Sequence, residues 1–153
     1  TDFTLFSYIA KGKLESALEC LHTLMRTKDS ASVASVCASR LSTYFRRALS
    51  VQINVAAGCG MGLRFGEDSS AFSKKVFEGD RPISMPKDKE IYRSACTNYS
   101  QKDMERILVI LAEYDIKIKE IGTALQSIML EKCIIDIICR KGKHVRPLEF
   151  AKI

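Results

Sequence analysis

Apolar residues recur with a helical period along almost the whole chain, and no segment alternates convincingly as a strand does. The clearest helix covers residues 13–27, where the apolar positions follow the i, i+3, i+4, i+7 spacing of one buried stripe: Leu14, Ala17, Leu18, Leu21, Leu24 and Met25. A shorter helix is predicted over residues 4–10, with Gly12 as its stop. The chain therefore begins as two short, consecutive helices.

A long helix is predicted next, capped by Ser30 or Ser32 and reaching about Ala57. Its apolar positions step by threes and fours: Val33, Cys37, Leu41, Tyr44, Ala48, Val51 and Val55. Such spacing occurs in coiled coils and in ordinary bundles, and we favour the bundle. Glycines at 58, 60, 62 and 66 then interrupt the pattern, a weak helix is expected over 68–77, and an irregular crossing over 79–86.

Three further helices are predicted in the second half of the chain. The first covers residues 87–98, and the next begins at Ser100, which forms a capping-box pattern with Asp103. Asp115 and Lys119 are four residues apart with the acid first, which favours an intrahelical ion pair. Gly122 is expected to end this helix, and Thr123 with Gln126 to start the last one.

The last predicted helix, residues 123–139, is apolar around much of its circumference. A helix of this kind has to lie at the centre of its domain or be covered by another chain. We expect the central position, with Ile134 buried. The whole pattern predicts an all-α helical bundle of about six to seven helices, in which residues 1–140 form one helical domain for oligomerisation and residues 141–153 a basic tail.

Composition agrees with one domain, since the chain has 153 residues of which 46% are apolar. The net charge of +6 is concentrated at one end: residues 1–139 hold 19 basic and 17 acidic groups, and residues 140–153 hold 5 and 1. A basic tail can contact phosphate, so a helical nucleic-acid-binding module that uses this tail is the alternative function. No leader peptide or membrane span is recognised, and we expect a soluble, cytoplasmic protein without membrane contact.

No pattern of catalytic or ligand-binding residues stands out. The glycines at 58–66 follow a predicted helix and lack the Gly-Lys-Ser/Thr ending of a phosphate-binding loop. The six cysteines contain no C-x-x-C pair, and Cys20 and His22 point to different faces of one helix. We expect reduced thiols, no metal, no cofactor and no enzymatic activity in this domain. A small redox or metal protein remains a competing hypothesis.

Three segments carry a family resemblance: FTLFSYIAKGKLESALECLHTLM, SRLSTYFRRALSVQINVAAG and RPISMPKDKEIYRSACTNYSQKDMERILVILAEYDIKIKEIG. Their order and spacing resemble the C-terminal domain of the delta subunits of bacterial DNA polymerase III. In those proteins a short helix, a glycine and an amphipathic helix open the domain, and a helix begun at a serine closes with a D-x-x-x-K pattern. Here that pattern is Asp115 and Lys119.

The resemblance implies a non-catalytic collar domain of a clamp loader, the complex that loads the sliding clamp onto DNA during replication. The parent complex is a DNA-directed DNA polymerase, a nucleotidyltransferase, in which delta neither binds nor hydrolyses ATP. The implied partners are the delta-prime and the tau or gamma subunits, and DNA would be met only through the assembled complex. Candidate subunit-interface residues are Arg46 and Arg47 on the long helix and Asp115 and Lys119 on the later one.

Overall fold

The computed structural model describes residues 1–27, 33–58, 77, 83 and 85–143, and these residues form six α-helices and no strand. The helices are α1 (Asp2–Ala10), α2 (Leu14–Thr27), α3 (Val33–Gly58), α5 (Pro86–Asn98), α6 (Gln101–Glu120) and α7 (Thr123–Arg140). The predicted all-α bundle is confirmed. The loop after Gly58 and all of the helix expected over 68–77 except Phe77, which lies in a turn, are outside the described residues.

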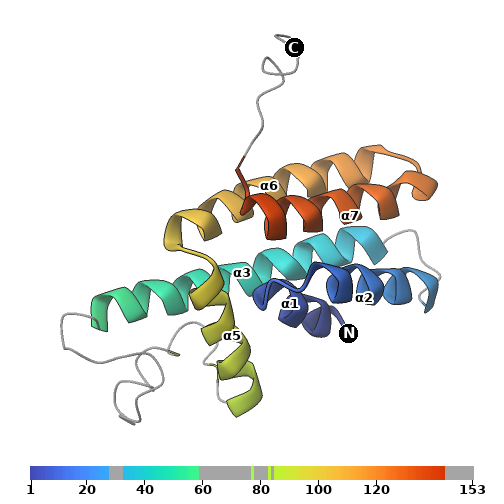
Figure 1. The fold of residues 1–153 in the computed structure, drawn as a ribbon. Coiled ribbons are helices and arrows are strands. Elements are labelled where there is room, and N and C mark those ends of the chain that lie inside the picture. The colour runs from blue at the N-terminus through green and yellow to red at the C-terminus, as the bar shows by residue number, and fades with distance from the viewer. Residues whose placement is uncertain (28–32, 59–76, 78–82, 84, 144–153) are drawn as a thin grey trace.

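The bundle is organised around the long helix α3, which packs most extensively along α6 (Figure 1). α6 and α7 run side by side as an antiparallel hairpin, α2 packs against α7 and α1, and α1 contacts α3 across the core. α5 crosses the bundle near the start of α6 and contacts both α1 and α3. Segments from both ends of the chain therefore share one core.

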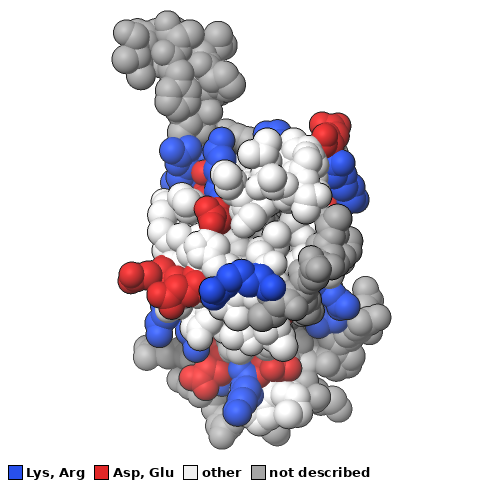
Figure 2. Space-filling view, turned by 90° about the vertical axis from the view of Figure 1, so that its right-hand side faces the viewer, with Lys and Arg blue, Asp and Glu red and all other residues white. Residues whose placement is uncertain are grey.

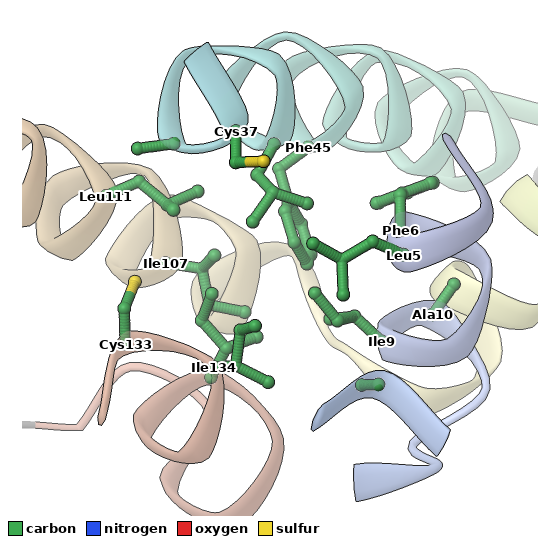
Figure 3. Packing of buried hydrophobic residues seen from close by; sticks show 14 of the residues in the cluster. Leu5, Phe6, Ile9, Ala10, Cys37, Phe45, Ile107, Leu111, Cys133 and Ile134 are labelled. Atoms are coloured by element: carbon green, nitrogen blue, oxygen red, sulfur yellow. The ribbon is translucent and has the colours of Figure 1, made fainter. Parts of the chain in front are cut away.

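The core joins aliphatic side chains from α6 and α7 to an aromatic cluster from α1, α3 and α5. Figure 3 shows Ile107, Leu111 and Ile134 on one side of the core and Leu5, Phe6 and Ile9 on the other, with Phe45 between them. The Phe6 and Phe45 rings lie 5.2 Å apart in an edge-to-face arrangement, and Phe45 meets Tyr99 in the same way at 5.8 Å. These contacts tie the first helix to the middle of the chain.

Local signals set several helix ends. The predicted capping box is confirmed: the Asp103 amide donates to Ser100 Oγ at 3.1 Å, and the Ser100 amide donates to Asp103 Oδ2 at 2.9 Å. α7 begins at Thr123 as predicted, but the predicted capping by Thr123 and Gln126 is wrong, because Gly122 is the N-cap and no side chain caps this helix. Gln126 instead donates its amide to the Ile118 carbonyl at 3.1 Å, which fastens the α6–α7 turn.

α7 is not the central helix, so that expectation is also wrong. Its inner residues Leu130, Cys133, Ile134 and Ile137 are buried, but Leu125, Ile128 and Ile135 on its outer side face solvent. The core needs only one side of α7, because α3, α6 and α1 supply the remaining apolar side chains. The second side is left uncovered within the described part of the chain.

A left-handed turn follows the end of α7 at Arg140. Lys141 and Gly142 have φ angles of 52° and 78°, which close the helix with bonds back to Ile137 and Asp136. A Cβ atom on Gly142 would lie 2.9 Å from the Ile107 backbone nitrogen, so only glycine fits here without a shift. The expected domain boundary at residue 140 coincides with the helix end, and residues 144–153 of the predicted tail lie outside the described residues.

Candidate assembly surface

The outer side of α7 carries a regular row of exposed residues, which we call the α7 seam: Leu125, Ile128, Lys132, Ile135 and Cys139. Successive members are three, four, three and four residues apart, the heptad spacing of a helix that packs along another helix. Leu125 is 56% exposed, Ile128 61% and Ile135 38%. This row was missed at the sequence level, although its spacing was readable in the sequence.

An exposed apolar row of this kind is unusual on a helix that already buries its opposite side. Single apolar residues on a surface need no explanation, but contiguous ones mark interaction sites. Figure 2 views the molecule from the end where α6 passes into α7. In that view an uncharged surface lies at the centre, and acidic and basic groups lie around it, several of them next to one another. The exposed apolar residues of the α7 seam give it the character of a contact surface.

A second, weaker row lies on the outer side of α6. Val109 and Ile116 are 56% and 59% exposed, and Ala112 between them is exposed as well. Glu105 and Lys119 end this row with charges. It is shorter and less apolar than the α7 seam, which makes the seam the stronger candidate.

The four candidate interface residues from the sequence fall into two separate places. Asp115 accepts a bond from Lys119 Nζ at 2.9 Å, as predicted, and another from Ser35 Oγ at 3.3 Å that ties α6 to α3. Arg46 is exposed and bonds back to Ser42 and Thr43 of its own helix.

Arg47, the fourth candidate, is only partly exposed. Its guanidinium lies near the Tyr92 hydroxyl and lowers the pKa of that hydroxyl, which opposes the effect of burial. Burial nevertheless raises the pKa of Tyr92 to about 12.

The two candidate pairs lie apart. Ser35, which bonds to Asp115, precedes Arg46 by about 16 Å along α3, so the Arg46–Arg47 pair and the Asp115–Lys119 pair do not form one cluster. Their role in an interface stays a prediction.

An open depression lies between α2 and α7. It measures about 660 Å³ and is lined by Glu19, His22, Thr23, Met25, Arg26 and Ser127. His22 bonds to Glu131 across it, and both side chains are partly exposed. A pair of this kind links two helices at the surface and contributes about 1 kcal/mol or less. Of the residues that line the depression, only Ser127 belongs to α7, next to Ile128 of the α7 seam.

The described cysteines, Cys20, Cys37, Cys96, Cys133 and Cys139, are thiols, and no group of three or more potential ligands in the described residues is placed to hold a metal. Cys59 lies outside them. Burial raises the pKa of Cys96 to about 12 and raises that of Cys133 further. Cys139, at the end of the α7 seam, is exposed.

These differences predict selective labelling. Because the thiolate is the reactive form, Cys139 should react with iodoacetamide near pH 8 at least about tenfold faster than Cys96 and Cys133. Peptide mass spectrometry after a timed quench measures the three rates. In urea the difference should disappear, and rapid labelling of Cys133 in the folded protein would contradict its placement in the core.

The fold and the surface together define a helical bundle with an uncovered heptad row on its last helix. In the described part of the chain, no helix combines the length and hydropathy needed to cross a membrane. Comparisons with family models, curated proteins and solved structures found no match to the chain. Any statement about its role rests on the residues themselves.

Proposed function

We propose that the chain is the C-terminal assembly domain of a delta subunit of bacterial DNA polymerase III. It holds delta beside the delta-prime and the tau or gamma subunits in the clamp loader. The domain acts by binding its neighbours, so that ATP-driven motions of other subunits reach the part of delta that acts on the clamp. The observation that carries assembly is the α7 seam, an apolar helix face that the described chain leaves uncovered.

Two features support the more specific reading as a delta subunit. The order of elements follows the family pattern: a short α1 ended near Gly12, an amphipathic α2, a long α3, and an α6 that begins at Ser100. The Asp115–Lys119 pair stands near the end of α6, where the family has its D-x-x-x-K pattern. These features support the proposal through resemblance, while the seam supports assembly through physical chemistry.

The test is reconstitution with the collar domains of delta-prime and tau from the same organism. Co-purification and a dissociation constant of about 1 μM or tighter by calorimetry are expected, because a standard interface of roughly 800 Å² per partner supports that affinity. Binding that rests on apolar burial should persist or strengthen as salt is raised.

The nucleic-acid alternative is favoured by one observation, the cluster of Arg140, Lys141 and Lys143 at the end of α7. Even so, Arg140 lies 3.9 Å from Asp136, and Lys141 lies over the Tyr99 ring. Contacts of a few cations with phosphates are weakened by salt, with log affinity falling by about 0.9 per phosphate for each decade. Duplex DNA binding seen at low salt should therefore vanish near physiological ionic strength. Salt-resistant DNA binding without partner association would replace the clamp-loader proposal with the nucleic-acid module.

A further inference from the structure

We propose that the α7 seam receives an amphipathic helix of a different polypeptide, and that this helix places a carboxylate opposite Lys132. The inference deepens the proposed function, since it assigns the surface and the chemistry of the partner in that assembly. The helix that binds the seam belongs to a different protein, and a second copy of this chain does not bind there.

The dimensions of the seam fit one helix. From Leu125 to Cys139 the row extends over fifteen residues, and the fourteen steps between them span about 21 Å of helix axis. Heptad spacing keeps the row facing one straight partner over that length, because successive members drift little around the helix. A loop or an extended strand would not present side chains at this repeat. The occupant is therefore a helix of about four turns.

Lys132 determines which helix can bind. It is exposed at the middle of the seam, with Ile128 before it and Ile135 after it. The neighbouring acids are already engaged: Glu131 pairs with His22, and Asp136 accepts a bond from Tyr114 Oη at 2.5 Å. Among the described residues Lys132 has no ion-pair partner. A covering helix has to supply the opposite charge, because an amine buried without a partner is costly.

A second copy of the chain would not satisfy this requirement. In a parallel pair of α7 helices, Lys132 meets the same residue of the other copy in one layer. In an antiparallel pair centred on the seam, the twofold axis passes beside Lys132, because Lys132 is the middle member of the row. The Lys132 ammonium groups of the two copies then lie together again. A shift by one heptad would avoid this contact but would leave half of the seam uncovered. A single lysine in a heptad row therefore acts against self-pairing and selects a partner with an acid at this level.

The first experiment requires no partner. By sedimentation equilibrium, the wild-type chain should be a monomer up to about 100 μM. Lys132→Leu removes the charge from the seam and should strengthen self-association by at least about tenfold, whereas Lys102→Leu, at an exposed lysine on α6, should leave the chain monomeric. A wild-type dimer that Ile128→Glu dissolves, or a Lys132→Leu variant that stays monomeric, would overturn the inference.

The second experiment uses the delta-prime and tau collar domains as probes. Ile128→Glu and Lys132→Glu should each weaken partner binding by roughly tenfold to a hundredfold, because each places a second carboxylate at an acid-bearing interface. Ile53→Glu is the matched control, since Ile53 is 46% exposed on α3, outside the seam, and binding should not change. All three variants should keep the wild-type melting temperature.

The two proposals fail in different ways. If the wild-type chain binds its partners and the two seam variants bind equally well, the seam inference is wrong and the proposed function stands. If the wild-type chain binds no clamp-loader subunit, the proposed function is wrong, and the Lys132→Leu experiment alone decides the inference.

Discussion

Ile134→Asp is expected to unfold the domain or leave it folded only at low temperature. The Ile134 side chain is fully buried on the inner side of α7 and lies toward Ile107 of α6 (Figure 3). A carboxylate buried there without a partner costs several kcal/mol, while a whole domain is stable by about 5 to 15 kcal/mol. Circular dichroism during thermal unfolding measures the loss.

The adjacent residue supplies the control. Ile135→Asp makes the same chemical change one position along α7, on the side that faces solvent. Its melting temperature should stay close to wild type, although binding at the α7 seam should weaken. Two variants of equal stability would show that the two sides of α7 are not buried and exposed as described.

Tyr99→Ala is expected to lower the free energy of unfolding by a large amount, as Ile134→Asp is. The Tyr99 ring is buried against Phe45, and its hydroxyl donates to the Ile9 carbonyl at 2.8 Å, joining the α5–α6 corner to α1. Removing a buried aromatic ring typically costs about 3 to 5 kcal/mol. Urea denaturation of the wild type and the variant gives the difference in free energy of unfolding.

Tyr99→Phe separates the ring from the hydrogen bond. The Ile9 carbonyl also accepts a bond from the Gly12 amide at 3.0 Å, so it keeps one partner when the hydroxyl is removed. The loss should therefore be about 1 kcal/mol, the net value of one hydrogen bond. If the phenylalanine variant were as unstable as the alanine variant, ring packing would not be the main contribution of Tyr99.

Most of the fold was predictable because local signals and apolar periodicity agreed. Residues 13–27 were expected as a helix, and α2 covers Leu14–Thr27. Ser100 and Asp103 are close in sequence, and their reciprocal hydrogen bonds need no tertiary contact to form. The same is true of Asp115 and Lys119, one turn apart on α6.

The bonds that the sequence did not predict involve residues with long-range or alternative partners. Gln126 resembled a capping residue, but its amide donates to carbonyls at the end of α6. Asp115 also binds Ser35, 80 residues earlier in the chain, and no local pattern predicts that bond. Its role at an interface stays a prediction.

The position of α7 could not be predicted from its apolar circumference, because periodicity does not tell a side covered by the same chain from a side left for another. Only the packing of α7 against α2, α6, α3 and α1 separates Ile134 from its neighbour Ile135. Arg46 and Arg47 were proposed for the interface because they lie off the buried stripe of the long helix, and Asp115 and Lys119 because they match the D-x-x-x-K pattern. Neither criterion could identify the α7 seam, where four of the five members are uncharged.

The turn at Gly142 also governs how this protein can be tagged or tethered. Because Gly142 fits closely against the Arg106–Ile107 backbone, the chain leaves α7 beside the first turns of α6. A fluorophore or affinity handle fused after Lys143 would therefore start near the Cys139 end of the seam, about 21 Å from Leu125. Attachment at the α6–α7 turn, near Gly122, would label the opposite end. The two placements report on different halves of a bound helix and would reveal its direction.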